Sequence, residues 1–125
     1  MNARRRKQLI FTDLDGSLLD HYTYSFRSAL PVLRQLERRL VPVVPVSSKT
    51  RAELEPLRHE LANVGPFIVE NGAAIFVPEG YFEQQPAGTT LRKGFWVREF
   101  VGPRQRWLDL LDGLRPEFFD EFDCF

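Results

Sequence analysis

The chain has 125 residues, the size of one ordinary domain, and 43% of them are hydrophobic, which is typical of a globular protein with a core. Seventeen basic and seventeen acidic residues give a formal net charge of zero, so the charge gives no argument for nucleic acid or a membrane surface as a partner. The single cysteine, Cys124, excludes an internal disulfide and fits a reducing compartment. Because no apolar stretch approaches the roughly 20 residues that span a membrane, we expect a cytoplasmic protein.

The first predicted strand is the short apolar run of residues 9–11, which ends directly before Asp-Leu-Asp-Gly and is typical of a buried parallel strand. A loop rich in polar and aromatic residues is expected over 17–26. A helix follows, with Ser28 predicted as its N-cap and Pro31 in its first turn. The apolar face of this helix is expected to consist of Leu30, Leu33, Leu36 and Leu40.

The second predicted strand covers residues 41–46 and ends at Ser47-Ser48. Pro45 lies inside this run, so we expect it at a position where the strand needs no hydrogen-bond donor. Thr50 and Glu53 match a capping box and predict the start of a second helix. The first turn of that helix is the expected place for Pro56.

A third strand is predicted at residues 67–69; the chain then turns at Glu70-Asn71-Gly72 and returns at 74–77. The order of elements to this point is strand, helix, strand, helix, strand. Such alternation predicts an α/β fold with a parallel, doubly wound, Rossmann-like sheet.

The composition changes after Pro78. Residues 79–94 contain Gly, Pro, Gln and Thr and are predicted to form a linker or loop. A strand is predicted at 95–100 and a helix at 103–114. The apolar side of that helix is expected to consist of Trp107, Leu108 and Leu111.

Three polar clusters fall at the carboxyl ends of the three predicted strands: Asp13 to Gly16, Ser47 to Lys49, and Glu70 to Gly72. Ligands of open α/β sheets bind at this edge, so the coincidence predicts one site built from all three. Asn71 and Gly72 are candidates for the pocket floor or entrance, although Glu-Asn-Gly by itself more often forms only a turn.

The chemistry that suits Asp13 and Asp15 is phosphoryl transfer. A carboxylate can attack phosphorus and form an aspartyl phosphate, which makes Asp13 the candidate nucleophile. Asp15, two residues later, can protonate the leaving group and then deprotonate the attacking water. Since carboxylates repel a phosphate, a divalent cation such as Mg²⁺ is expected. Gly16 allows backbone N–H groups to approach the phosphate closely.

Ser47 ends the second predicted strand near the start of a helix. Its hydroxyl, together with the backbone N–H groups that follow at Ser48 and Lys49, suits an anionic oxygen. The side chain of Lys49 can add positive charge. These residues are therefore predicted to bind the substrate phosphate.

Asp13-Leu14-Asp15-Gly16-Ser17 and Ser47 resemble the first two motifs of the haloacid dehalogenase-like phosphatase superfamily. The segments "FTDLDGSLLD", "VPVSSKTRAE" and "FIVENGAAIFVP" are together similar to the mannosyl-3-phosphoglycerate phosphatases, of the Cof-like subgroup with an α/β cap. The resemblance implies hydrolysis of a small phosphorylated sugar–glycerate substrate to mannosylglycerate and phosphate. It implies that Asp13 is the nucleophile, that Asp15 is the general acid/base, and that Ser47 holds the phosphoryl group. Mg²⁺ would be held by the Asp13 side chain and the Asp15 backbone carbonyl.

The same resemblance implies that this chain is an N-terminal portion of such an enzyme. Residues 1–80 would form the N-terminal part of the phosphatase core, and 81–125 a linker and the beginning of the cap. The lysine and acidic motifs expected further downstream are assigned to no residue here, neither to Lys93 nor to Asp120, Glu121 and Asp123. An unfinished sheet would leave an edge that invites self-association.

Two alternatives stay open at this point. The alternatives to a mannosyl-3-phosphoglycerate phosphatase are another sugar phosphatase of the same superfamily and an inactive half-domain that binds a phosphate or a partner. A phosphoacceptor receiver domain is disfavoured because the third strand ends in Glu70 rather than in an acceptor Asp. A P-loop enzyme is excluded because no glycine-rich stretch ends in Gly-Lys-Ser/Thr.

Overall fold

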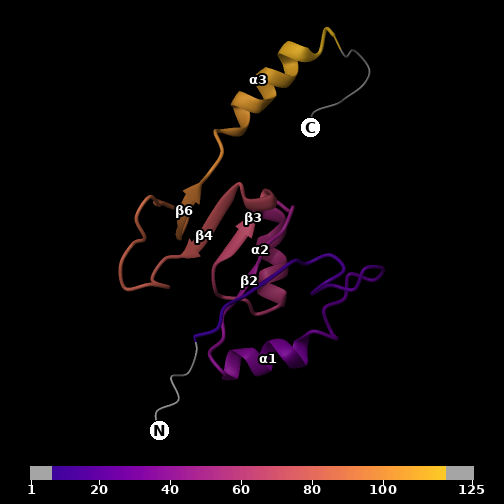
Figure 1. Cartoon of the computed structure of the whole chain (residues 1–125), viewed down its shortest axis with the longest axis vertical. Coiled ribbons are helices and arrows are strands. Elements are labelled where there is room, and N and C mark those ends of the chain that lie inside the picture. The colour runs from indigo at the N-terminus through magenta and orange to yellow at the C-terminus, as the bar shows by residue number, and fades with distance from the viewer. Residues whose placement is uncertain (1–6, 118–125) are drawn as a thin grey trace.

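The computed structural model describes residues 7–117, with helices at the two ends of an elongated molecule and a sheet between them (Figure 1). In chain order its elements are β1 (Ile10–Thr12), α1 (Leu30–Arg38), β2 (Val43–Pro45), α2 (Arg51–Glu60), β3 (Phe67–Val69), the 3₁₀ turn η1 (Glu70–Gly72), β4 (Ala74–Pro78), β5 (Thr90–Arg92), β6 (Phe95–Glu99) and α3 (Arg104–Leu114). The predicted alternation of strands and helices up to β3 is confirmed.

The first three strands run parallel to one another. β1 pairs with β2 so that Ile10 lies opposite Val43, and a parallel bridge joins Val46 to Ile68 of β3. Each of these strands reaches the next through a helix, as parallel neighbours require. Their carboxyl ends, and the polar clusters that follow them, therefore lie at the same edge of the sheet.

Pro45 takes the kind of position that the sequence predicts. The N–H of Val46 donates to the carbonyl of Thr12 in β1 at 2.8 Å. Successive N–H groups of a strand point in opposite directions, so the nitrogen of Pro45 faces β3 instead. Because proline has no N–H to donate there, β2 and β3 are joined by an isolated bridge rather than by a full ladder.

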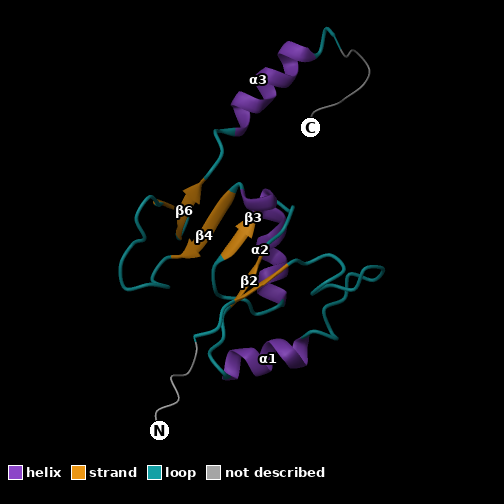
Figure 2. Ribbon diagram, in the orientation of Figure 1, coloured by secondary structure: helices purple, strands orange, loops and turns teal. Residues whose placement is uncertain are grey.

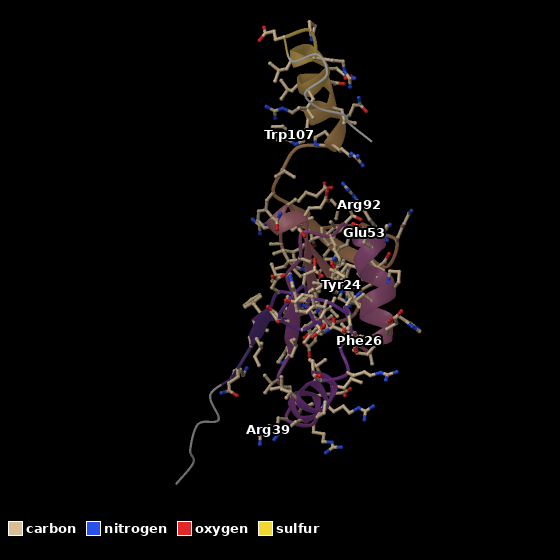
Figure 3. All side chains as sticks on the ribbon, turned by 90° about the vertical axis from the view of Figure 1, so that its right-hand side faces the viewer. Tyr24, Phe26, Arg39, Glu53, Arg92 and Trp107 are labelled. Atoms are coloured by element: carbon tan, nitrogen blue, oxygen red, sulfur yellow. The ribbon has the colours of Figure 1, made fainter. Side chains whose placement is uncertain are left out.

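The strands β3, β4, β6 and β5 form a four-stranded antiparallel sheet in this order, and in this respect the parallel sheet predicted from the sequence is incomplete. β4 pairs antiparallel with β3 and with β6, and β6 pairs antiparallel with β5. The reversal follows from the tight turn of η1, which sends the chain straight back beside β3 (Figure 2). β5 lies inside the segment 79–94, which the sequence predicts as a loop because glycine, proline and glutamine precede this three-residue strand.

The starts of α1 and α2 differ in how they are capped. Ala29, not Ser28, is the N-cap of α1, it makes no side-chain cap, and Pro31 lies in the first turn. The Ser28 prediction is therefore wrong, and the fixed φ of proline is what favours the helix start here. In α2 the capping box of Thr50 and Glu53 is confirmed.

Pro56 does not lie in the first turn of α2 as predicted, but further inside the helix. A proline there removes one hydrogen bond, normally donated to the carbonyl four residues earlier, which is that of Ala52. Both residues are exposed, so water can take the place of the missing donor.

The core lies between α2 and the strands β3, β4 and β6. The Phe67 ring stacks on Phe76 at 5.1 Å and meets Phe95 edge-on at 5.5 Å between centroids. The buried cluster comprises Leu14, Leu19, Leu54, Phe67, Val69, Ala74 and Val97. Leu14 is 0% exposed, so the loop that follows β1 is anchored directly in the core.

A buried arginine connects α2 to the sheet. The Arg58 guanidinium lies 3.9 Å from the centroid of the Phe67 ring and donates hydrogen bonds to the Gly65 carbonyl and to Oδ1 of Asn63. Asn63 Nδ2 donates in turn to the Val43 carbonyl of β2 at 2.9 Å. Burial lowers the pKa of Arg58 from its ordinary value, since the charged form loses solvation.

α3 extends beyond β6, at the opposite end of the molecule from α1 (Figures 1 and 2). It covers Arg104–Leu114, close to the predicted range, but it buries none of its residues. Trp107, predicted on its apolar side, is 46% exposed. No described helix combines the length and apolar character needed to cross a membrane. The terminal acids and phenylalanines after residue 117 lie outside the described residues.

We predict that Asn63→Ala lowers the free energy of unfolding by about 1–3 kcal/mol, because it leaves the Val43 carbonyl and the Arg58 Nε–H without their partner. Urea unfolding followed by circular dichroism measures this change. Gln105→Ala is the control: it removes an exposed hydrogen bond on α3 and should change the value by less than about 0.5 kcal/mol. Equal effects of the two substitutions would contradict the proposed role of Asn63.

Candidate active site

The three polar clusters predicted from the sequence meet at one edge of the sheet. Lys49 Nζ contacts Oδ2 of Asp15 at 2.9 Å and Oδ1 at 3.3 Å, which joins the loops after β1 and β2. The Glu70 N–H donates to the Lys49 carbonyl at 3.0 Å, and the Asn71 N–H donates to the Ser47 carbonyl at 3.0 Å. The turn after β3 is thus joined to the loop after β2 by two backbone hydrogen bonds.

Asp13 and Asp15 are both exposed, and the residue between them is buried. Asp13 Oδ1 accepts the N–H of Leu14 at 2.7 Å, and the Thr12 hydroxyl donates to the Asp13 carbonyl at 2.8 Å. The Asp13 carboxylate is therefore held by the adjacent backbone N–H, whereas the Asp15 carboxylate is held by Lys49 in the loop after β2.

Gly16 ends the acidic segment with φ of +75°, a conformation that favours glycine. A Cβ built there would lie 3.7 Å from Nδ1 of His21, an ordinary contact, so backbone conformation rather than space is what requires glycine. The Gly16 N–H donates to the Leu19 carbonyl at 2.9 Å. His21 is a neighbour of the site that the sequence did not indicate.

The loop beyond Gly16 is ordered by Asp20, which is not among the site residues predicted from the sequence. Asp20 Oδ1 accepts the N–H groups of Tyr22 and Thr23 at 3.0 and 2.8 Å and the Thr23 hydroxyl at 2.9 Å. The pKa of Asp20 is lowered from its ordinary value, chiefly by the backbone hydrogen bond from Thr23. The Asp-x-x-Thr spacing of Asp20 and Thr23 is typical of turns in which an aspartate side chain accepts backbone N–H groups, and it could have predicted this turn.

Ser47 is buried at the end of β2, and its role in phosphate binding stays a prediction. Its Oγ accepts the Lys49 N–H at 3.1 Å, and its own N–H donates to the Ile68 carbonyl at 3.1 Å. The Lys49 N–H is thus engaged within the loop, contrary to the expectation that it faces an anion. The Ser47 hydroxyl hydrogen is still available as a donor, and Ser48 is exposed beside it.

Lys49 has a partner that the sequence did not predict. Its pKa is raised from its ordinary value, chiefly by the hydrogen bond with the Asp15 side chain. The two residues are 34 positions apart in the sequence, so no local pattern reveals the pair. The signal lies in the strand register, in which Thr12 of β1 lies opposite Pro45 of β2. This register places Asp15 and Lys49 just beyond the ends of two neighbouring strands.

Asn71 and Gly72 lie in η1, with φ of +55° and +97°. Both are exposed. The Asn71 backbone N–H bonds to Ser47, so this turn borders the loop that carries the predicted phosphate site. A role of the two residues in a substrate pocket stays a prediction.

The metal-ligating potential of the site rests on the acidic segment that contains Asp13 and Asp15. Within residues 7–117 the structure holds no group of three or more His, Cys, Asp or Glu side chains arranged to bind a metal ion. Mg²⁺, however, commonly uses one or two carboxylates and completes its shell with water and substrate phosphate. The exposed carboxylate of Asp13 fits that donor set, whereas both carboxylate oxygens of Asp15 contact Lys49 Nζ.

Residues 10–88 match the family model of haloacid dehalogenase-like hydrolases. The chain belongs to this family. A structure of a haloacid dehalogenase-like hydrolase from B. subtilis covers 88% of the chain with a TM-score of 0.60 and 25% identity, over 34% of its own length. A phosphatase of the same superfamily from Bacteroides thetaiotaomicron covers 94% with a TM-score of 0.64 and 17% identity, which supports the fold alone. The described elements thus form part of the α/β fold of this family.

Curated relatives match this chain at 44–53% identity. Glucosyl-3-phosphoglycerate/mannosyl-3-phosphoglycerate phosphatase of Methanococcoides burtonii is 53% identical over 109 residues, which is 87% of the chain and 40% of the relative. The protein of the same description from Persephonella marina is 53% identical over 73 residues, covering 58% and 27%. Mannosyl-3-phosphoglycerate phosphatase of Pyrococcus furiosus is 44% identical over 81 residues, covering 65% and 33%. The chain therefore spans well under half the length of these relatives.

We predict a pH-dependent loss of stability from the Glu53 carboxylate next to the site. The hydrogen bonds from the backbone N–H and the hydroxyl of Thr50 lower its pKa, the backbone bond being the larger cause. Its contribution is therefore fully present above its ordinary pKa of 4.5 and is lost as the pH falls through the lower folded-state pKa. Urea unfolding at several pH values should show a smaller acid-induced loss of stability for Glu53→Gln than for the unmodified chain. Identical pH profiles would contradict this assignment.

Proposed function

We propose that the protein is a Mg²⁺-dependent phosphatase acting on mannosyl-3-phosphoglycerate, with mannosylglycerate and inorganic phosphate as products. The observation that carries the proposal is the 53% identity, over 87% of the chain, to a relative described as a glucosyl-3-phosphoglycerate/mannosyl-3-phosphoglycerate phosphatase. The two exposed carboxylates beside the Ser47 loop supply the chemistry that this reaction needs. Within this proposal the enzyme acts in the cytoplasm on a small sugar–glycerate substrate.

In the first half-reaction Asp13 acts as the nucleophile. Because Oδ1 is engaged by the Leu14 N–H, Oδ2 is the oxygen that attacks phosphorus. A bond forms between Oδ2 and phosphorus, the bond between phosphorus and the glycerate oxygen breaks, and Asp15 gives its proton to that oxygen. The products are free mannosylglycerate and an aspartyl phosphate on Asp13.

In the second half-reaction Asp15 takes a proton from water. The water oxygen attacks phosphorus, the bond to Asp13 breaks, and inorganic phosphate leaves with Asp13 again a carboxylate and Asp15 again protonated. The Ser47 hydroxyl donates to a phosphate oxygen throughout, and the backbone at Gly16 and Ser48 borders the same oxygen atoms. Mg²⁺, held by the Asp13 carboxylate and the Asp15 backbone carbonyl, would offset the negative charge of the phosphate.

The domain boundary and the association state belong to the same proposal. We place the end of the core portion near residue 80 and the beginning of a cap after it. Among the described strands β1 pairs with β2 alone, so its outer edge is open, and Phe11 on this strand is 60% exposed. We infer that this edge supports self-association, as unprotected edge strands do.

Phe11→Lys should therefore shift the chain toward the monomer, because a charged side chain on an edge strand opposes pairing with a second chain. Sedimentation velocity at several protein concentrations measures the association state. Val32→Lys on α1, an exposed apolar residue away from the edge, is the matched control and should leave association unchanged. A strictly monomeric unmodified chain would refute the inference.

The phosphatase proposal predicts Mg²⁺-dependent release of inorganic phosphate from mannosyl-3-phosphoglycerate, measured in a coupled colorimetric assay. Asp13→Asn should abolish release, because an amide oxygen does not form the covalent intermediate. Ser47→Ala should reduce it by roughly 10²-fold, the size typical of losing one donor to a developing anion. Lys93→Met, a substitution between β5 and β6, serves as the control with unchanged release.

Release that survives Asp13→Asn would overturn the mechanism. Mg²⁺-dependent phosphate binding without release would instead favour a phosphate-binding role. Comparing mannosyl-3-phosphoglycerate with its glucosyl counterpart under the same conditions determines which sugar this chain prefers, since the relatives' descriptions include both.

A further inference from the structure

We propose that Lys49 is the positioning residue for Asp15, holding its carboxylate in one orientation, rather than a ligand of the substrate phosphate. The inference rests on the proposed function, in which Asp15 transfers the proton. Its basis is the contact of Lys49 Nζ with both carboxylate oxygens of Asp15, at 2.9 and 3.3 Å.

Lys49 is suited to this role because its backbone is fixed on both sides. Its N–H donates to Ser47 Oγ at 3.1 Å, and its carbonyl accepts the Glu70 N–H at 3.0 Å. The next residue, Thr50, is the N-cap of α2 and is tied to Glu53. The loop that carries the ammonium group is thus held by β2, by the turn after β3 and by α2. Only the side-chain torsions of Lys49 must be ordered to form the contact.

Asp15 needs such a partner more than Asp13 does. Asp13 is oriented locally, by the Leu14 N–H. Asp15 is exposed, and the residue after it, Gly16, has a left-handed backbone conformation. Among the described side chains, Lys49 donates the hydrogen bonds to the Asp15 carboxylate. A carboxylate without a partner would distribute over three staggered χ1 orientations. Proton transfer requires one of them, since catalytic groups act only from a well-defined position.

The sequence assigned Lys49 to phosphate binding, and the two roles make different predictions. A phosphate ligand contributes to affinity for phosphate, so its removal weakens binding. A positioning residue contributes to the orientation of Asp15, so its removal leaves phosphate affinity nearly unchanged and slows turnover. Its charge acts through Asp15 and not on the substrate.

The decisive measurement is the χ1 distribution of Asp15, obtained by NMR from three-bond couplings to its Cβ protons. We expect one staggered rotamer in the unmodified chain and averaged couplings in Lys49→Met. The couplings of Asp13 should be the same in both, which shows that the loop is still folded. Lys49→Arg, which keeps a cation in reach, should restore a single Asp15 rotamer, and Lys93→Met should change nothing. A single unchanged rotamer in Lys49→Met would overturn the proposal.

Two further readouts separate positioning from phosphate binding. Calorimetric titration with inorganic phosphate in the presence of Mg²⁺ should give dissociation constants within about twofold for Lys49→Met and the unmodified chain. In the phosphatase assay, kcat of Lys49→Met should fall by about 10²-fold with little change in KM, the loss expected when a catalytic group is misplaced. A more than tenfold weaker phosphate affinity would overturn the proposal in favour of phosphate binding. If the unmodified chain releases no phosphate, the proposed function fails, and the Asp15 rotamer still decides the role of Lys49.

Discussion

The burial of Leu14 is the constraint on which the rest of the site depends. Leu14 lies between the two acids, is 0% exposed, and packs in the same cluster as Leu54 of α2 and Phe67 of β3. Leu14 lies in the turn that follows β1, where its carbonyl accepts the N–H groups of Ser17 and Leu19. With the middle residue anchored in the core, Asp13 and Asp15 are both exposed at the carboxyl end of β1.

Buried Leu14 and the backbone hydrogen bonds fix the conformation of the site more than the ion pair between Lys49 and Asp15 does. The side chains of Lys49 and Asp15 are 26% and 40% exposed, and ion pairs at such positions contribute about 0–1 kcal/mol to stability. The backbone bonds of Ser47 and Lys49 to the turn after β3 fix the loop itself. The ion pair then determines which way one carboxylate points, a matter of orientation and not of folding energy.

The sequence predicts the parts of this structure that are encoded locally. The apolar run before Asp-Leu-Asp-Gly, the capping box of Thr50 and Glu53, and the position of Pro45 are all confirmed, because each follows from the preferences of adjacent residues. The N-cap of α1 at Ala29 was missed because the sequence prediction followed the cap preference of Ser28, whereas the fixed backbone of Pro31 favours the first turn of the helix.

Features that depend on contacts distant in sequence were not predictable in the same way. β5 is only three residues long and is paired with β6, which in turn pairs with β4. The pairing of Lys49 with Asp15 required the register of β1 against β2, which no single segment encodes. The sequence predicted that Asp13, Asp15, Ser47 and Asn71 lie at one edge of the sheet. It did not predict which residues form hydrogen bonds with them.

The central claim is that Asp13 is the group that becomes phosphorylated. Beryllofluoride mimics a phosphoryl group on a carboxylate, and ¹⁹F NMR distinguishes its bound form from the free anion. With Mg²⁺ present, the account predicts a bound resonance for the unmodified chain and for Asp15→Asn, because Asp15 moves the proton and does not form the bond. Asp13→Asn should abolish that resonance. A bound resonance that persists in Asp13→Asn, or that never appears with the unmodified chain, would contradict the account.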